Sequence, residues 1–384
     1  MERTESASWE YGVATAATLS VRAAEDVIFS LLDGRPTAFC ESEQRLYALN
    51  PVAALIWCCL DEGGGREAAC ARLVEAGVDR ETAVRDVDDG IRRLLEMGLL
   101  RAERQPSRRR HVCAFRMDGS SYSIETPRRG LSHQIAALFD PRPSWVEEAA
   151  AAHFDVIDID GSLYIFRANR MVGSCEPDAL APTMKTLVTA QILARERAEI
   201  IFHAACLSHR GRALLVSGPP GAGKTTLALQ LASRGFGYGG DDIALIGADG
   251  SAKGLPFAPT VKSGAWDIVA EFRPDLRSAP VHCRPDGKNV KYLNLDATAP
   301  EPHPVGWVVF LRRQQGVAVD VVPLNGEKAL VRIIEAAYSP IQRLSLAGFG
   351  ALRRMFAGAK TIELIYENSA EAATVLSNLC HDVN

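Results

Sequence analysis

The segment from Leu214 to Thr226 constrains the fold of this chain more than any other. An apolar run is followed by Gly-x-x-x-x-Gly-Lys-Thr over residues 218–225, and alternate leucines then continue toward Gly235. This order predicts a buried strand, a glycine-rich loop and a helix that begins at the loop. In such loops backbone N–H groups turn toward phosphate oxygens, the lysine reaches the outer phosphates and the hydroxyl binds magnesium. The segment therefore predicts a nucleotide site.

Seven residues of this pattern are predicted to bind the nucleotide: Gly218, Gly221, Ala222, Gly223, Lys224, Thr225 and Thr226. Thr225 is also a predicted metal ligand, and Lys224 is a catalytic candidate. The cofactors that we expect are Mg²⁺ and ATP or GTP, and the motif leaves open which of the two nucleotides binds.

Two adjacent carboxylates follow the predicted loop helix. Gly239-Gly240-Asp241-Asp242 stands at the head of an apolar strand at residues 243–246. Phosphoryl transfer to a hydroxyl needs a base and a cation that bridges phosphate oxygens. We predict Asp241 as the base and Asp242 as the metal ligand. Neighbouring side chains of a strand point to opposite faces, so both reach one site only at a strand end or bend, which the glycines favour. The alternative is a solvated turn.

His203 is a third catalytic candidate, beside Asp241 and Lys224. It lies in Ile201-Phe202-His203-Ala204-Ala205, just before the strand that leads into the loop. An imidazole there can donate to phosphates or orient a carboxylate. A satisfied core histidine is the alternative for such an apolar run.

The length of 384 residues exceeds what one hydrophobic core usually serves, so we expect two or three domains. The net charge is −4, which argues against general nucleic-acid binding, and residues 1–100 alone carry −8. The basic, proline-containing stretch 101–110 predicts a solvated linker, with a phosphate- or nucleic-acid-binding arm as the alternative. We therefore divide the chain into a domain at 1–100, a linker at 101–110 and a second domain at 111–384.

The first hundred residues predict a small α+β domain of winged-helix-like layout. Two short strands at 38–40 and 45–49 flank a polar turn, and helices follow at 50–60, 66–76 and 79–97.

This layout resembles the PqqD-like family of peptide-binding domains, over about residues 20–102. The resemblance rests on Tyr47-Ala48-Leu49-Asn50, on Ala54-x-x-Trp57 followed by Leu60-Asp61, and on Leu94-Leu95-Glu96-Met97-Gly98-Leu99-Leu100. Members of that family bind the leader of a ribosomally made peptide as an added strand. The alternative is a winged helix used only for dimerisation or packing.

The catalytic motifs together resemble the HPr kinase/phosphorylase family, over roughly residues 195–250. Phe202-His203-Ala204-Ala205, the loop and Gly240-Asp241-Asp242-Ile243 follow one another in the family's order. The resemblance implies a phosphoenolpyruvate-carboxykinase-like P-loop kinase fold, in which His203 assists at the phosphates and the aspartate pair supplies base and metal contact. It also implies a serine hydroxyl as acceptor.

One departure from that family redirects the expected substrate. The glycine- and glutamate-containing signature that follows the aspartates in carrier-protein kinases does not occur here. Residues 255–264, followed later by residues 288–293, are more similar to the HPr-kinase-related enzymes of peptide biosynthesis, including lasso-peptide kinases. This puts phosphorolysis and a carrier-protein substrate in doubt.

Outside these motifs the second domain has three further parts, of which only the C-terminal one, from about residue 305, is predicted to be scaffold. Residues 111–182 read as a β-rich segment that leads into the kinase domain, in which Asp158–Gly161 is a tight turn rather than a calcium loop. An amphipathic helix is expected at 184–199. Three cations are candidates for contacts with nucleotide or acceptor, or else are plain surface charges: Lys262, Arg284 and Lys291. Beyond them we expect a buried strand at 305–311, a late strand at 361–366 and helices at 326–337, 345–357 and 369–380.

The nine cysteines form no Cys-x-x-Cys pair, which favours reduced thiols in a cytoplasmic protein. The longest plain apolar run, residues 53–60, is too short to cross a bilayer, so no membrane partner is expected. Relatives of the kinase domain often assemble, which leaves a homo-oligomer open.

Together these features predict an α/β kinase that holds a precursor peptide by its leader and phosphorylates a hydroxyl, here a serine, with ATP and Mg²⁺. Two alternatives stay open. One is a nucleotide-dependent switch or ATPase that acts on a bound partner, and the other is a kinase for a small molecule or a folded carrier protein.

Overall fold

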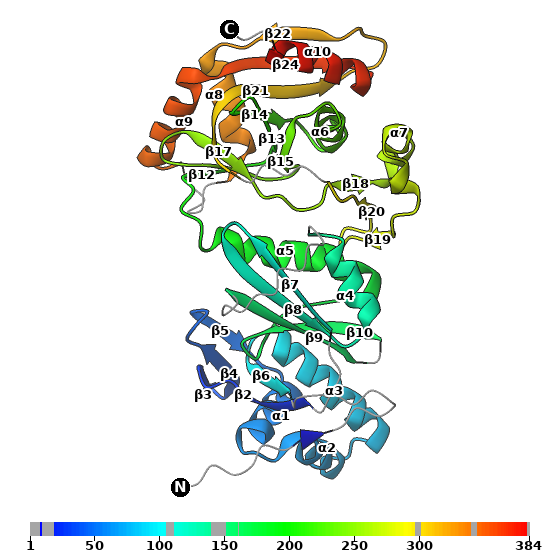
Figure 1. Ribbon diagram of the computed structural model, residues 1–384. Coiled ribbons are helices and arrows are strands. Elements are labelled where there is room, and N and C mark those ends of the chain that lie inside the picture. Colours follow the sequence, from blue (N-terminus) through cyan, green and yellow to red (C-terminus); the bar gives the residue numbers. More distant parts are fainter. Residues whose placement is uncertain are drawn as a thin grey trace. The chain divides into compact units, whose positions relative to one another are not determined.

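The computed structural model describes residues 8–9, 19–104, 111–139, 151–159, 161–295, 301–338 and 344–381. It is a mixed α/β structure with several sheets (Figure 1). The chain divides into two compact units. One comprises Met1–Cys113, Ser123–Ser132 and Ala152–Pro177, and the other comprises Ala114–Tyr122, His133–Ala151 and Asp178–Asn384. No helix among the described residues is long and apolar enough to cross a membrane.

The first unit contains the predicted hairpin and the three predicted helices. The hairpin is extended by a third antiparallel strand, giving a sheet of β3 (Val27–Leu32), β4 (Arg35–Cys40) and β5 (Arg45–Ala48). The helices are α1 (Pro51–Asp61), α2 (Gly65–Glu75) and α3 (Arg80–Glu96). A second small sheet has the order β1 (Ser8–Trp9), β2 (Leu19–Ala23) and β6 (Leu100–Arg104).

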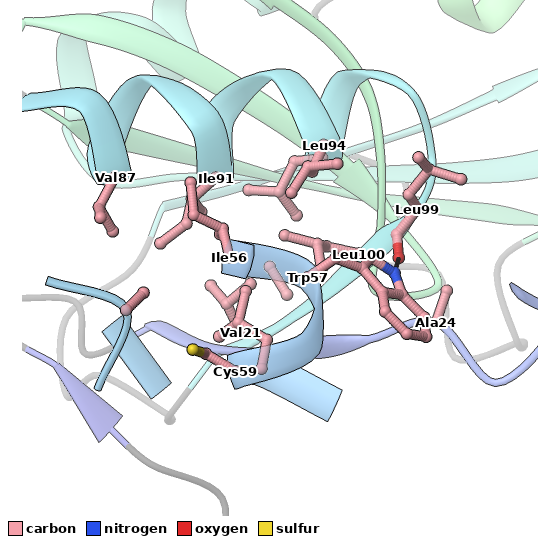
Figure 2. Close-up of a cluster of buried hydrophobic side chains, with 14 of the residues drawn as sticks. Val21, Ala24, Ile56, Trp57, Cys59, Val87, Ile91, Leu94, Leu99 and Leu100 are labelled. Atoms are coloured by element: carbon pink, nitrogen blue, oxygen red, sulfur yellow. Dashed lines mark hydrogen bonds between the residues drawn. The ribbon is translucent and has the colours of Figure 1, made fainter. Parts of the chain in front are cut away.

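Side-chain caps fix the starts of two of these helices. The side chain of Asn50 accepts a hydrogen bond from the backbone N–H of Ala53 at 2.7 Å, and Pro51 supplies a preset φ in the first turn. Asp79 caps α3 in the same way through Thr82 at 3.0 Å. Between the helices lies an apolar core in which the indole N–H of Trp57 donates to the Leu99 carbonyl at 3.1 Å (Figure 2).

The strand at Leu100–Arg104 corrects the prediction that the linker begins at residue 101. Leu100 and Ala102 are buried and pair with β2, so the alternation of a half-buried strand outweighs the basic composition. Residues 105–110 of the predicted linker lie outside the described residues.

A five-stranded sheet follows in the sequence, with the order β11-β10-β9-β8-β7, in which β10 is antiparallel to both β9 and β11. Its strands are β7 (His111–Met117), β8 (Ser120–Thr126), β9 (Ala152–Ile159), β10 (Ser162–Arg167) and β11 (Arg170–Cys175), and α4 (Arg129–Ala136) follows β8. The backbone N–H of Gly161 donates to Asp158 at 3.1 Å where β9 turns into β10, so the predicted tight turn is confirmed. The apolar side chains of Ile157, Tyr164 and Phe166 belong to the core of the first unit. The domain boundary drawn from sequence therefore differs from the compact units, because these strands were assigned to the second domain.

The second unit is built on a ten-stranded sheet. Its path runs β15-β13-β14-β21-β17-β16-β12-β23, and β24 pairs with β21 and β22. β14 (Arg212–Ser217), β21 (His303–Arg313) and β24 (Lys360–Tyr366) are parallel neighbours. The other strands are β12 (Ile200–Phe202), β13 (Ala205–His209), β15 (Gly237–Gly240), β16 (Ala244–Ile246), β17 (Ser251–Gly254), β22 (Asp320–Pro323) and β23 (Ala337–Tyr338).

Helices cover both faces of this sheet. Successive apolar side chains of β14 point to opposite faces, so each face needs helices to bury it. Leu214 and Val216 pack toward α6 (Lys224–Ala232) and α10 (Ser369–His381), whereas Ala213 and Leu215 pack toward α8 (Gly326–Ala336) and α9 (Leu346–Gly358) (Figure 1). The two strands and three helices predicted beyond residue 304 are confirmed, and their ends agree with the prediction to within two residues.

A small sheet of β18 (Thr260–Lys262), β20 (Asn289–Tyr292) and β19 (His282–Cys283) lies beside α7 (Trp266–Phe272). The 3₁₀ turns at Ser263–Ala265 and Pro274–Arg277 contact α7, and a further 3₁₀ turn at Pro177–Ala179 precedes α5 (Leu180–Leu193). The helix expected at 184–199 is α5, which runs from Leu180 to Leu193. It therefore begins and ends earlier than the periodicity indicated.

Candidate functional site

The glycine-rich loop lies where the sequence predicts it. β14 ends at Ser217, and α6 begins at Lys224 directly after the loop. Gly221 and Gly223 have φ of +87° and +96°, in the left-handed region that glycine adopts without strain. A Cβ on Gly223 would lie 2.6 Å from the hydroxyl oxygen of Tyr366, so the backbone at the helix start has no room for a side chain. The hydroxyl of Tyr366 donates to the Ala222 carbonyl. Burial raises the pKa of Tyr366 to about 12, which keeps it a donor.

Lys224 folds back along its own loop. Its ammonium group donates to the Gly218 carbonyl at 2.7 Å, and the residue is 8% exposed. Burial lowers the pKa of Lys224; Asp242 opposes this effect and Lys262 adds to it.

Asp241 is a buried carboxylate bonded directly to the loop helix. Its Oδ2 accepts the hydroxyl of Thr225 at 3.0 Å and the backbone N–H of Thr260 at 3.0 Å. Only 2% of the side chain is exposed. The chain bends just before it. Gly240 has φ +151°, and a Cβ there would lie 2.5 Å from the Leu255 carbonyl oxygen. The bend that the glycines predicted is therefore present.

Asp242 has a different environment from its neighbour, because 48% of its side chain is exposed. Burial disfavours its charged form, but Lys185, His203 and Arg284 outweigh this effect, so the pKa of the Asp242 carboxyl is lowered. Asp242 is therefore a half-buried anion among cations, whereas Asp241 is a fully buried acceptor of hydrogen bonds.

His203 lies between β12 and β13, close to both the loop and the aspartates. Its backbone carbonyl accepts the hydroxyl of Ser217, the last residue of β14, at 3.2 Å. Burial and then Lys224 lower the pKa of the His203 ring, and Asp242 opposes them. The ring is only partly buried, which disfavours the alternative of a plain core histidine.

Lys185 is a site residue that the sequence analysis missed. It lies on α5, and its ammonium group donates to the Thr260 hydroxyl at 2.7 Å. It also lies 3.8 Å from Oδ1 of Asp241 and 3.6 Å from Oδ2 of Asp242. The available signal was that Lys185 is the only charged residue in α5, whose other side chains are apolar or uncharged polar groups.

A cavity of about 360 Å³ opens beside the aspartate pair. Asp241 and Asp242 form part of its wall, and the glycine-rich loop does not. The remaining lining residues come from α5, the strand ends and the β19–β20 turn: Pro182, Lys185, Thr186, Thr189, Ile243, Leu255, Phe257, Thr260, Arg284, Pro285, Asp286 and Tyr292. The aspartates thus stand between the loop and a cavity large enough for one or two side chains.

The three candidate cations have different surroundings. Arg284 lines the cavity and pairs with Asp286 at 3.2 Å. Lys262 is exposed at the end of β18. Lys291 donates to the Leu276 carbonyl at 2.9 Å and the Arg277 carbonyl at 3.1 Å. Its ammonium is therefore occupied by the backbone, which does not support the interpretation of Lys291 as a ligand contact.

The nine cysteines are all free thiols. Among the described residues, one group of possible metal ligands lies in the first unit, where Glu125, His153 and Asp155 bring side-chain atoms within 4.8 Å of one another. It belongs to a different unit from the aspartate pair.

Fold and site together define a mixed α/β protein in which a glycine-rich loop at a helix start adjoins a carboxylate pair and a cavity. Residues 31–100 match the family model described as Coenzyme PQQ synthesis protein D (PqqD). The predicted PqqD-like domain is thereby confirmed for that segment, which is a small part of the chain.

The chain is also similar to two solved structures. One is TbiB1 in complex with the TbiA(beta) leader peptide, at 29% identity over 21% of this chain and 93% of that chain, with a TM-score of 0.20. The other is an Hpr(Ser) kinase/phosphatase from Coxiella burnetii, at 15% identity over 47% of this chain and 95% of that chain, with a TM-score of 0.23. With TM-scores this low, neither likeness carries an inference about this chain. No curated protein matches the sequence.

Proposed function

We propose that this chain is an ATP-dependent kinase that phosphorylates a serine hydroxyl of a ribosomally made precursor peptide, held by its leader at the PqqD-like domain. The observation that carries the proposal is the hydrogen bond from Thr225 to Asp241. It ties the glycine-rich loop to a carboxylate pair that also lines a cavity. A phosphate donor on one side and a hydroxyl acceptor on the other would meet at that pair.

The loop supplies what a triphosphate needs. The free N–H groups at the start of α6 and the positive end of its dipole favour an anion. Lys224 would exchange its bond to the Gly218 carbonyl for the outer phosphates, because its ammonium is already in the loop. A buried lysine is a strong partner for phosphate since water competes little.

The donor set fits Mg²⁺. Thr225 and the aspartates offer hydroxyl and carboxylate oxygens, the hard ligands that Mg²⁺ prefers. When bound, Mg²⁺ would neutralise charge on the phosphate oxygens. Because Asp241 accepts directly from Thr225, we assign Asp241 to the metal side of the site, the reverse of the division of roles predicted from sequence.

Asp242 then becomes the base. It is the more exposed carboxylate of the pair, and it lines the cavity. In the transfer step, the acceptor oxygen forms a bond to the γ-phosphorus while the bond to the ADP oxygen breaks, and the hydroxyl proton passes to Asp242. In a loose transition state this carboxylate mainly orients the hydroxyl. His203 adds a neutral or charged donor next to the phosphates.

The sheet of the PqqD-like domain supports leader binding. β3 and β5 are its edge strands, and an edge presents unpaired N–H and C=O groups to an added strand. Ile28 and Leu46, which flank Phe39 across the sheet, are 69% and 61% exposed. These side chains provide apolar contact area for a bound peptide. A held leader raises the effective concentration of the core, so the cavity need not bind the acceptor tightly.

Mass spectrometry of candidate precursor peptides, each incubated with ATP, Mg²⁺ and either the intact protein or Lys224→Ala, tests the proposal. We expect one phosphoryl mass increment or more with the intact protein alone, and fragmentation places it on serine. If no peptide gains mass while ATP is consumed at a Lys224-dependent rate, the peptide-kinase proposal fails and the switch or small-molecule alternative takes its place.

A further inference from the structure

Lys185 lies close to both aspartates, although it is part of neither the glycine-rich loop nor the other sequence motifs of the site. The ammonium of Lys185 reaches both carboxylates from α5, at 3.8 Å from Asp241 and 3.6 Å from Asp242. Only 13% of its side chain is exposed. These distances exceed those of direct hydrogen bonds, so the ammonium acts on the pair through its charge.

The position of this ammonium is fixed by other partners. It donates to the Thr260 hydroxyl at 2.7 Å and lies 5.6 Å from the centre of the Phe257 ring. Thr260 also donates its backbone N–H to Asp241 at 3.0 Å. The same residue therefore holds the cation and one of the carboxylates, which sets their separation.

Two neighbouring carboxylates repel each other, and burial makes the repulsion stronger. The Oδ2 atom of Asp241 is occupied by Thr225 and Thr260, while its Oδ1 atom faces Lys185. Asp242 has Lys185 as its ion-pair partner within 4 Å among the described residues. Lys185 therefore offsets the charge of both carboxylates.

We propose that Lys185 is a positioning residue of the site. Its ammonium attracts both carboxylate side chains and holds them in place, with Asp242 turned to the cavity. This inference rests on the proposed kinase function, in which Asp241 serves the metal side and Asp242 the acceptor.

The chain offers a matched control. Lys253 is also a partly buried lysine between two carboxylates, at 2.6 Å from Asp118 and 3.1 Å from Glu196, with 21% of its side chain exposed. It does not line the cavity. If Lys185 were only a structural ion pair, Lys185→Met and Lys253→Met would behave alike.

The first readout is the kinetics of phosphoryl transfer by the full chain. For Lys185→Met we expect kcat to fall by about 30-fold or more while KM for ATP changes by less than about threefold. Lys185→Arg keeps the charge and restores part of the rate, and Lys253→Met stays within about threefold of the unchanged protein. Equal loss in both methionine variants would overturn the proposal.

The second readout needs no activity and separates this inference from the kinase proposal. Thermal unfolding is followed with EDTA and with saturating MgCl₂, both without nucleotide. We expect Mg²⁺ to raise the Tm of Lys185→Met more than that of the unchanged protein, because the cation replaces the missing ammonium. It should not do so for Lys253→Met. Equal Mg²⁺ responses in all three proteins would reject the role of Lys185, even if the unchanged protein phosphorylates a peptide. Conversely, if no peptide is phosphorylated, the kinase proposal is rejected. The Mg²⁺ dependence of Tm would still show whether Lys185 positions the two carboxylates.

Discussion

The two compact units present their functional groups in opposite ways. The sheet β3-β4-β5 of the first unit exposes apolar side chains and strand edges, with Ile28 and Leu46 mostly in solvent. The site of the second unit buries charge, with Lys224 and Asp241 less than a tenth exposed. Exposed apolar surface binds a partner through area and tolerates variation, whereas a buried charge depends on each partner around it. Substitutions in the first unit should therefore change binding, and substitutions in the second should change chemistry.

The largest effect tests the buried charge directly. Lys224→Ala removes the ammonium proposed for the outer phosphates, and we expect phosphoryl transfer to fall by at least about 10³-fold. Binding of a fluorescent leader peptide, measured by anisotropy, should stay unchanged. Loss of leader binding together with transfer would show that the two functions do not separate between the units.

The aspartate pair gives the next largest effect. Asp242→Asn should lower kcat by about 10²- to 10⁴-fold while Mg²⁺-dependent ATP binding persists, because it removes the proposed base and leaves the loop intact. Asp241→Asn should weaken Mg²⁺-dependent binding as well, since it alters the acceptor of the Thr225 hydroxyl. Titration of a fluorescent ATP analogue with and without Mg²⁺ measures this difference. The reverse pattern would restore the division of roles predicted from sequence.

A smaller effect belongs to the exposed sheet. Ile28→Glu with Leu46→Glu places charge where an apolar peptide would dock, and we expect KM for the intact precursor to rise about tenfold with kcat unchanged. Leu346→Glu is the control, because Leu346 is a 93% exposed leucine of the second unit. An equal rise in KM from Leu346→Glu would mean that the effect is not one of leader docking.

The smallest effect concerns the fold of the first unit alone. Asn50→Ala removes the side-chain cap of α1 and should lower the free energy of unfolding by about 1 kcal/mol in urea titrations. Transfer by the folded protein should not change. Asn50→Asp, which keeps an acceptor, serves as the control. If the rate of phosphoryl transfer fell in the absence of urea and at a temperature well below Tm, Asn50 would have a role beyond capping α1.

The parts of the site that are contiguous in sequence were predictable. Strand, loop and helix follow one another from Leu214 to Ala232, and the bend before the aspartates follows from the glycines that precede them. The caps at Asn50 and Asp79 were likewise local signals. These features can be predicted because the interacting residues lie within a few positions of one another in the sequence.

The rest depends on contacts between distant segments. Lys185 meets Asp241 across 56 positions of the sequence and Thr260 across 75, and periodicity in α5 gives no sign of either partner. The sequence also could not predict that the side chain of Asp241 is buried while that of Asp242 is about half exposed. The two residues are chemically identical neighbours, so only their surroundings in the folded protein distinguish them. β3 and β6 were missed because exposed apolar residues in one and arginines in the other obscure the strand pattern.

If one chain couples leader capture to phosphoryl transfer, its rate must depend on whether the substrate carries the leader. The intact precursor and its leaderless core peptide are each incubated with the full-length protein, ATP and Mg²⁺, and the initial rates of phosphopeptide formation are measured by mass spectrometry. We predict phosphorylation of both, at a rate for the precursor that exceeds the core rate by about 10²-fold at concentrations below KM. Equal rates for the two peptides, or no phosphopeptide from either, would contradict the account.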